Sequence, residues 1–383
     1  MTAERPIRAP MGMPFCGIWC VLALAGSLLV VTTAPLGAQG TVVIDRSRVC
    51  ETCSIALRLV TTLRDSPATP FGVNGAAIAR DASGRIFVPS RGAPGEVYVF
   101  DGDGKFLRTL GRRGDGPGEY RVVNEVRVGA RDSLYLFDNA NARMTVLATD
   151  LTVARTARMP VAVRPTEVVI TSDGIIIAAD RVSTPDRVGL PLHVVDQSGT
   201  LLRSFGSDDT TRYVAMPFAM SRALALDRQG LVWAALRTSY RLVLWDLEGS
   251  QRIELSGNAS WFRPWATDAP LKPDAPPLPW IQAIQVDHQG HIWVLCRVAS
   301  EDFARSLVPE DTPRGRFYRI ADYARAFDTV IEVIDPTERR LIASARFDAY
   351  LTNFVEPGTA LGFRESAIGV PALDLWEVRL DTH

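Results

Sequence analysis

The sequence predicts an all-β fold built from repeated sheets. Five segments share one pattern, in which an apolar strand leads through a tight turn to a small residue, an aliphatic residue and usually an aromatic one. The turn centres are Gly84, Asp132, Gly174, Gly230 and Gly290, which are 48, 42, 56 and 60 residues apart. Repeats of roughly 40–50 residues that consist of strands are typical of propeller blades. We therefore predict a β-propeller.

Each of the five segments is one hairpin, and a second apolar hairpin follows it. The first hairpins are Ile78–Val88, Val126–Phe137, Val168–Ala178, Ala223–Ala235 and Ala283–Leu295. The second hairpins are Val97–Leu110, Met144–Ala157, Leu192–Phe205, Leu242–Leu255 and Val330–Ala345. Two hairpins supply four antiparallel strands, which make one blade. The strands are almost continuously apolar, as expected for sheets that neighbouring blades cover on both faces.

An Asp-x-x-Gly pattern recurs at the turns. It occurs at Asp81/Gly84, Asp101/Gly104, Asp196/Gly199, Asp227/Gly230, Asp246/Gly249 and Asp287/Gly290. Because an Asp carboxylate accepts hydrogen bonds from turn amides and Gly adopts a left-handed φ, the pattern predicts tight turns. A calcium loop is the alternative, but Arg112 stands where a loop beginning at Asp101 needs a bidentate Glu.

The last blade needs a strand from the other end of the chain. Asn353–Leu380 offers two inner strands and a third at Leu375–Leu380, and then the chain stops. Ile55–Leu63 (IALRLVTTL) resembles outer strands such as Lys105–Leu110 (KFLRTL). We therefore predict six blades, the sixth completed by the N-terminal strand, which removes edges that would invite aggregation.

The N-terminus is predicted to be a targeting segment. No charged residue occurs between Arg8 and Asp45, Ile18–Val31 is apolar, and Leu36-Gly37-Ala38 forms a cleavage site. The domains are then a signal peptide at 1–38, a short segment at 39–54 and the propeller at 55–383. An uncleaved N-terminal anchor is the alternative, since Met11–Ala38 is long enough to cross a bilayer. Either way we expect an exported protein, in the periplasm or at the cell exterior.

The cysteines fit an oxidising compartment. Cys50 and Cys53 form a C-x-x-C motif, which we predict to be a structural disulfide. A zinc site would need a second pair of ligands, and a thioredoxin-like pair would open a helix rather than precede a strand. Cys296 lies in an apolar strand and is predicted to be a buried thiol.

The charge balance argues against nucleic acid as a partner. There are 42 Lys+Arg and 43 Asp+Glu, for a net charge of −1, whereas nucleic-acid binding requires a basic face. Lys105 and Lys272 are the only lysines, a bias that suggests a GC-rich bacterial genome. We expect a monomer, because a closed ring has no edge that demands a partner, and no membrane contact beyond the N-terminal segment.

The repeat resembles the NHL-type and TolB-like six-bladed β-propellers of bacteria. Asp138–Met144 (DNANARM) resembles the NHL bridge into the third strand, and Gly111–Tyr120 (GRRGDGPGEY) is similar to a loop of exported bacterial propellers. The likeness covers roughly residues 55–380. The resemblance implies a six-bladed ring but no single activity, since such propellers include enzymes, sensors and scaffolds.

One face of the ring is predicted to carry the long connections. These are Gly111–Asn124, Ser207–Ser221, Ser256–Trp280 and Ala299–Asp328, and long segments on a rigid scaffold are usually functional. We therefore expect any ligand site at the channel mouth of this loop-rich face. The candidate contacts are Arg112, Arg113, Asp115 and Glu119 in the first connection and Trp261, Arg263 and Trp265 in the third. The alternative is that these residues only turn the chain and pack the loops onto the ring. The connection Ala299–Asp328 is expected to be a short helix and lid or a solvated basic loop.

No catalytic motif is present. The sequence lacks a Gly-x-Ser-x-Gly elbow, a His-Glu-x-x-His zinc motif and a phosphate-binding Gly-x-x-x-x-Gly-Lys loop. We therefore predict a non-catalytic protein that binds a small molecule, a carbohydrate or a partner protein, with no catalytic residue, metal ligand or cofactor. The alternative, implied by the resemblance, is a metal-dependent lactonase- or lyase-like enzyme with a metal such as calcium on the axis. Glu125, Glu167 and Gln282, near the starts of inner strands, are its candidate donors.

Overall fold

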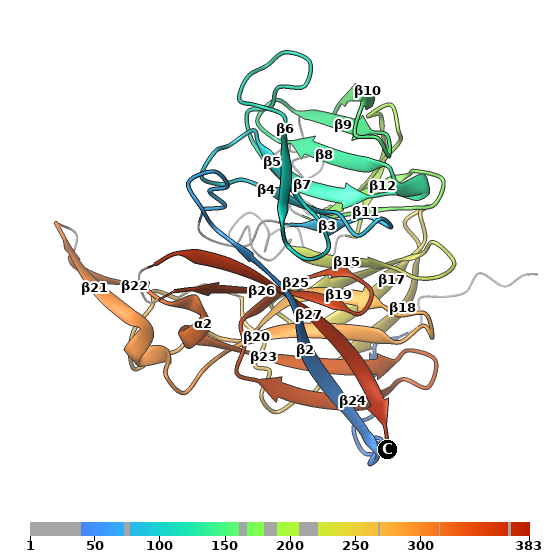
Figure 1. The fold of residues 1–383 in the computed structure, drawn as a ribbon. Coiled ribbons are helices and arrows are strands. Elements are labelled where there is room, and N and C mark those ends of the chain that lie inside the picture. Colours follow the sequence, from blue (N-terminus) through green and yellow to red (C-terminus); the bar gives the residue numbers. More distant parts are fainter. Residues whose placement is uncertain are drawn as a thin grey trace, which may run out of the picture. The chain divides into compact units, whose positions relative to one another are not determined.

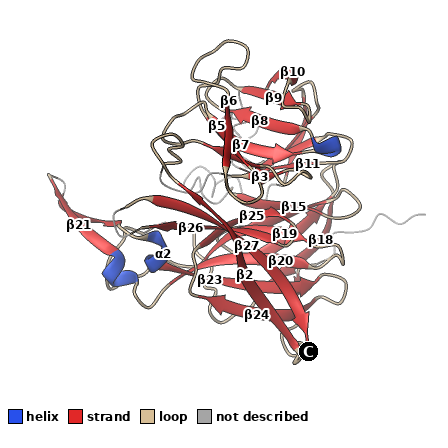
Figure 2. Ribbon diagram, in the orientation of Figure 1, coloured by secondary structure: helices blue, strands red, loops and turns tan. Residues whose placement is uncertain are grey.

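The protein is an all-β six-bladed propeller (Figure 2). The computed structural model describes residues 40–72, 77–160, 167–179, 190–206, 221–266, 269–313, 315–366 and 369–383. The chain divides into two compact units, Met1–Gly37 and Ala38–His383, and the described residues belong to the second. The predicted signal peptide lies outside them. In the described part of the chain, no helix is long and apolar enough to cross a membrane.

Blades 1 to 3 follow one another along the chain, each with its innermost strand first. Blade 1 consists of β3 (Ala79–Arg80), β4 (Ile86–Pro89), β5 (Val97–Phe100) and β6 (Phe106–Leu110). Blade 2 consists of β7 (Val123–Val128), β8 (Leu134–Asp138), β9 (Arg143–Leu147) and β10 (Val153–Arg158). Blade 3 consists of β11 (Glu167–Ile170), β12 (Ile176–Ala179), β13 (Leu192–Val195) and β14 (Leu201–Phe205).

Blades 4 to 6 complete the ring. Blade 4 consists of β15 (Arg222–Leu226), β16 (Val232–Leu236), β17 (Arg241–Trp245) and β18 (Gln251–Ser256). Blade 5 consists of β19 (Trp280–Val286), β20 (Ile292–Ala299), β23 (Phe327–Asp335) and β24 (Arg340–Phe347). Blade 6 consists of β25 (Leu351–Glu356), β26 (Thr359–Glu365), β27 (Pro371–Thr382) and β2 (Cys53–Arg64).

The core lies between the blades. Each inner strand contacts the inner strands of the two neighbouring blades, so the six blades surround an axis. Six buried apolar clusters each combine residues of two adjacent blades; Phe87 and Val126, for example, join blades 1 and 2. This packing explains why the strands are apolar on both faces, as the sequence predicted.

The N-terminal strand closes the ring as predicted. Strand β2 pairs antiparallel with β27 from Cys53↔Thr382 to Arg64↔Ala372, and Figure 1 shows the two strands side by side in blue and red. Thr61 Oγ1 also donates a hydrogen bond of 2.9 Å to Gly102 O in blade 1. The outer strand of the last blade is therefore in contact with the first.

A segment that the sequence did not reveal as structured precedes β2. This N-terminal segment, residues 40–52, begins with β1 (Val42–Val43), which runs parallel to β18 of blade 4. It then follows β24 of blade 5, where Asp45 bridges Arg340 and Cys50 N donates to Ile342 O. The segment therefore joins blades 4, 5 and 6.

The predicted disulfide is present between Cys50 and Cys53, with Cα atoms 5.3 Å apart, at the point where the N-terminal segment enters β2. Cys296 is fully buried, and its burial raises the pKa of the thiol well above its ordinary value.

The turns behave as predicted. Asp287 Oδ1 accepts hydrogen bonds from the backbone N–H groups of Gln289 and His291, and Gly290 has a φ of +91°. Blade 2 lacks a glycine at its first turn, and Arg131 and Asp132 adopt φ values of +56° and +60° instead. The turn is thus preserved at the cost of two non-glycine residues in the left-handed region.

The connection within blade 5 differs from the prediction. It contains a short 3₁₀ turn (Phe303–Ser306), a β-hairpin of β21 (Leu307–Thr312) and β22 (Gly315–Ile320), and helix α2 (Tyr323–Ala326). The short helix was expected, but the hairpin was not. The segment is solvated as expected, since the described residues of 308–317 are exposed, but it is a hairpin rather than a loop. Leu307 and Ile320 pack against the buried cluster between blades 6 and 1, which holds the base of the hairpin.

Candidate functional site

A polar cavity lies on the axis at the starts of the inner strands, where the long connections enter. Its volume is about 400 Å³, and we call it the loop-face chamber. Every blade contributes to its lining, which comprises Ala77, Glu125, Glu167, Ser221, Arg237, Trp280, Gln282, Tyr350, Thr352 and Asn353. The site expected at the channel mouth of the loop-rich face therefore has a cavity to occupy.

Strand alternation explains how these side chains reach the axis. Residues two apart on a strand point to the same side, so Glu125 and Arg127 of β7 both face the channel, as do Trp280 and Gln282 of β19. Val126, which lies between Glu125 and Arg127, is buried in the core. The polar positions of otherwise apolar inner strands thus build the site.

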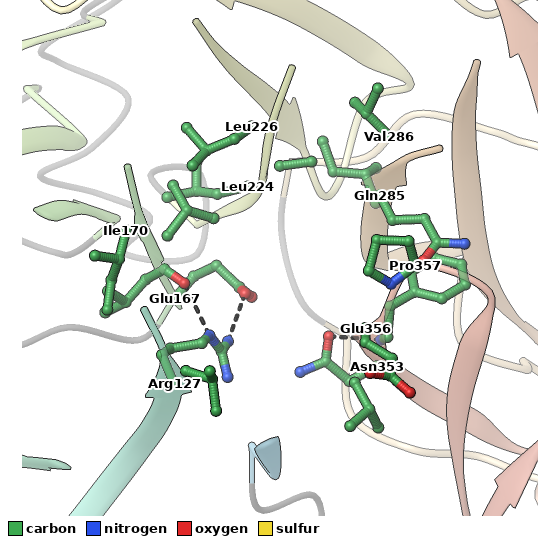
Figure 3. A pocket seen from close by; sticks show the side chains of 17 residues that line it. Arg127, Glu167, Ile170, Leu224, Leu226, Gln285, Val286, Asn353, Glu356 and Pro357 are labelled. Carbon is green, nitrogen blue, oxygen red and sulfur yellow. Dashed lines mark hydrogen bonds and ion pairs between the residues drawn. The ribbon is translucent and has the colours of Figure 1, made fainter. Parts of the chain in front are cut away.

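A second cavity lies deeper in the channel, toward the ends of the inner strands (Figure 3). This turn-face chamber has a volume of about 260 Å³ and is lined mainly by apolar side chains, among them Ile170, Leu224, Leu226 and Val286. Glu167 and Asn353 line both chambers. Figure 3 shows Arg127 and Glu167 directed toward each other on one side of it.

Four charged side chains lie where the chambers meet. In this charged cluster, Glu167 accepts from Arg127 Nη2 at 2.9 Å and from Arg237 Nη2 at 2.7 Å. The fourth member, Glu125, lies 3.1 Å from Arg127 Nη2. Arg127 comes from blade 2, Glu167 from blade 3, and Arg237 from the connection after β16 in blade 4. The cluster therefore holds three blades together electrostatically.

Both arginines use their donors on protein groups. Arg127 Nε donates to Val168 O at 2.8 Å and Nη1 to Val126 O at 3.0 Å. Arg237 Nη1 donates to the carbonyls of Ile281 and Gln282. The guanidiniums are thus fixed by backbone and carboxylate oxygens rather than directed at solvent.

Of the two carboxylates in the charged cluster, Glu125 has the fewer hydrogen bonds to offset its burial. It is 6% exposed, and its Oε2 accepts no hydrogen bond from the described residues. Burial raises the pKa of Glu125 to about 8, and repulsion from Glu167 adds to it, although Arg127 opposes the shift. The opposition is incomplete because Arg127 donates its hydrogen bond to Glu167.

The carboxyl of Glu125 is expected to make folding less favourable as pH rises. Between the ordinary pKa of 4.5 and about 8, the folded protein binds more protons than the unfolded chain, so the free energy of unfolding falls with pH. Glu125→Gln removes this loss and is expected to raise the free energy of unfolding at pH 9 by about 1–3 kcal/mol, with a smaller effect at pH 4. Urea unfolding at both pH values measures it. Glu51→Gln, at an exposed position, is the control, and an equal effect of Glu125→Gln at both pH values would contradict the prediction.

The predicted contacts of the first long connection bond mainly within the loop. Glu119 pairs with Arg112 at 2.8 Å and accepts from the N–H groups of Asp115 and Gly116. The hydrogen bond from Gly116, followed by the one from Arg112, lowers the pKa of Glu119. Asp115 pairs with Arg121 at 2.6 Å. These charges therefore stabilise the loop itself.

The two motifs that suggested a family resemblance contact each other. Asn141 Nδ2 donates to Gly114 O at 3.3 Å, and Arg143 donates to the carbonyls of Asp115, Gly116 and Glu119. The Asp138–Met144 segment thus anchors the Gly111–Tyr120 loop to blade 2.

The aromatic residues of the third connection pack onto the ring. Trp261 makes edge contacts with Tyr240 and Phe262. Trp265 donates to Pro279 O at 2.8 Å and lies against Trp280, with ring centres 5.6 Å apart. Through Trp280, Trp265 supports a wall of the loop-face chamber. Arg113 and Arg263 are exposed.

The candidate oxygen donors Glu125, Glu167 and Gln282 do converge on one chamber. Arg127 Nη2 is within 3.1 Å of Glu125 and 2.9 Å of Glu167, however, so a guanidinium stands between the two carboxylates. Among the described residues, no group of three or more His, Cys, Asp and Glu is arranged to hold a metal ion.

Sequence reasoning missed most of the lining. Arg127, Arg237, Tyr350 and Asn353 were not singled out, and Trp280 was noted only as the end of the third long connection. A usable signal exists for Asn353 and Trp280, since polar or aromatic residues at the start of an apolar inner strand point to the channel. Arg237 follows β16, and nothing local indicates that it reaches the axis.

The comparisons with known proteins agree with this architecture. A family model described as a six-bladed β-propeller matches residues 77–233. No curated protein matches the chain in sequence.

Solved structures with the same fold cover nearly the whole chain. A DUF4221 family member from Bacteroides vulgatus is 8% identical, covers 87% of this chain and 99% of its own, and has a TM-score of 0.57. A Bacteroides fragilis protein that carries the description of an exported protein is 11% identical, with coverages of 88% and 99% and a TM-score of 0.51. Virginiamycin B lyase from Staphylococcus aureus is 10% identical, with coverages of 85% and 99% and a TM-score of 0.46. At these identities the likeness to the two Bacteroides structures shows the fold alone. The fold and the chambers on its axis define this protein as a six-bladed β-propeller with a polar cavity at the starts of its inner strands.

Proposed function

We propose that this protein is an exported, non-catalytic bacterial propeller of the NHL- or TolB-like type that binds a small polar ligand in the loop-face chamber. The observation that carries the proposal is the chamber itself, about 400 Å³ in volume, with lining from all six blades. That volume is in the usual range of ligand pockets. A partner protein could occupy the same chamber by inserting one polar side chain into it.

The lining suits a hydroxylated ligand such as a carbohydrate. Trp280 offers an aromatic wall, and Gln282, Thr352 and Asn353 offer side-chain amides and a hydroxyl. These side chains stand on inner strands of the ring, so binding requires little ordering of the protein. Arg113 and Arg263, exposed and without an ion pair to a described residue, are the members of the predicted set that we propose contact a larger ligand at the rim.

The test is a binding screen read at Trp280. Monosaccharides, amino sugars and small organic acids are added to the purified protein, and indole N–H signals are followed by NMR after Trp280→Phe assigns the relevant one. We expect saturable shifts of the Trp280 signal, and a loss of affinity of at least about tenfold (1.4 kcal/mol) on Gln282→Ala or Asn353→Ala. Trp376→Phe in blade 6 controls for loss of a tryptophan.

Two outcomes would replace this proposal. If compounds move other indole signals but leave Trp280 unchanged, the ligand site is not in the loop-face chamber. If the purified protein holds stoichiometric calcium whose removal by a chelator lowers Tm, the lactonase- or lyase-like enzyme becomes the better account.

A further inference from the structure

The loop-face chamber contains a buried carboxylate oxygen that accepts no hydrogen bond from the described residues. Glu125 lines the chamber and is more than nine-tenths buried, and its Oε2 receives no hydrogen bond from the described residues. A buried carboxylate oxygen without a donor is costly, and native proteins rarely leave one without a role. A ligand that supplies an N–H or O–H group at this point would remove the cost.

In the described part of the chamber, both arginines are already engaged with protein oxygens. Each nitrogen of Arg127 donates to a protein oxygen, and both terminal nitrogens of Arg237 do the same. A carboxylate or phosphate ligand would have to compete with Glu167 for these guanidiniums. The two arginines beside the cavity therefore do not by themselves make it an anion site.

The neighbouring charges do not fully offset the cost of burying a charge on Glu125. Arg127 lies on its own strand, Glu167 faces it from β11, Arg237 from the connection after β16, and Arg91 from the connection after β4. Glu167 has hydrogen bonds from two of these arginines, whereas Glu125 has a contact of 3.1 Å to Arg127 Nη2 without hydrogen-bond geometry. A second cationic donor thus has an oxygen to bind.

We propose that the ligand is a small polyhydroxylated amine, such as an amino sugar, whose ammonium group donates to the Glu125 carboxylate. This inference rests on the proposed function and names the ligand class. The hydroxyl groups would meet Gln282, Thr352 and Asn353, and an apolar ring face would lie on Trp280. A charge-assisted hydrogen bond to a buried carboxylate supplies the preference over a neutral sugar.

Three probes of nearly equal size test the ammonium group. Glucosamine carries it, glucose has a hydroxyl in its place, and N-acetylglucosamine has the nitrogen acylated and uncharged. The pKa of Glu125 is raised to about 8, so its carboxyl is mostly protonated at pH 7 and must release this proton when the ammonium group binds. At pH 7 we expect glucosamine to bind at least about tenfold more tightly than either neutral sugar and to release a proton on binding, measured by titration calorimetry of the purified protein in two buffers of different ionisation enthalpy.

Glu125→Gln separates this inference from the proposed function. It keeps the shape of the side chain and removes its ionisable group, so the affinity for glucosamine is expected to fall to that for glucose. Glu51→Gln removes an exposed carboxylate and is expected to change nothing. Equal binding of the three sugars, absence of glucosamine binding, or a preference that survives Glu125→Gln overturns the inference. In each of these cases the proposed function would still stand if glucose binds and Asn353→Ala abolishes that binding. If no compound shifts the Trp280 signal, the proposed function and this inference are both wrong.

Discussion

Glu167→Ala is expected to destabilise the protein by about 3–5 kcal/mol in the free energy of unfolding, the usual cost of removing one partner from a buried ion pair. Glu167 is the shared acceptor for Arg127 and Arg237, whose side chains are only 17% and 10% exposed. Without it, two buried guanidiniums remain beside a single under-compensated carboxylate. Urea unfolding at pH 7 measures the effect.

The comparison with Glu125 makes this prediction specific. Glu167→Gln keeps the side-chain volume and is expected to destabilise, whereas Glu125→Gln is expected to stabilise at high pH, although both replace a carboxylate that lines the same chamber. The difference follows from hydrogen bonding, since Glu167 accepts from two arginines and Glu125 Oε2 from none in the described chain. A loss below about 1 kcal/mol for Glu167→Ala would show that the charged cluster contributes little to holding the blades together.

Arg46→Ala is expected to cost a similar amount, about 3–5 kcal/mol, and to release the N-terminal segment from blade 5. Arg46 donates to both oxygens of Glu332, at 2.8 and 2.6 Å, and Glu332 is fully buried. The same carboxylate accepts from Tyr240 Oη at 2.6 Å and from Ser344 Oγ at 3.2 Å. Hydrogen exchange of residues 41–50 is expected to accelerate along with the loss of stability.

Arg48→Ala is the matched control for Arg46→Ala. Arg48 is two residues away and also pairs with a carboxylate, Asp45, but its side chain is 64% exposed. Exposed ion pairs contribute about 0–1 kcal/mol, so we expect little change in unfolding or exchange. If the two variants behave alike, the buried bidentate pair is not what fixes the N-terminal segment.

Much of the fold could be predicted from the sequence because its signals are local and repeated. Asp227 and Gly230, like their counterparts in other blades, fix a turn through bonds within a few residues, and strand length and apolarity need no knowledge of partners. Pairing of Ile55–Leu63 with the last blade was predictable from a missing strand and a similar pattern.

The remaining features depend on contacts between distant residues. Arg46 meets Glu332, and Arg237 meets Glu167, across separations of 286 and 70 residues, and no local pattern marks either pair. The β21–β22 hairpin contains Pro309, Glu310 and Asp311, residues that are depleted in strands. The partners of the charges in the Gly111–Tyr120 loop are likewise not visible in the sequence. These charges therefore suggested ligand contacts, although most of them bond within the loop.

The pairing of β2 with β27 sets an order of events during synthesis. About 300 residues separate these strands, so β2 emerges early and has no partner until Pro371–Thr382 has been made. Such distant pairings form slowly, because the entropy cost of closing a long loop comes before any stabilising contact is made. Blade 6 therefore assembles after the other five blades, and apolar surfaces of blades 1 and 5 stay uncovered until Pro371–Thr382 has been made.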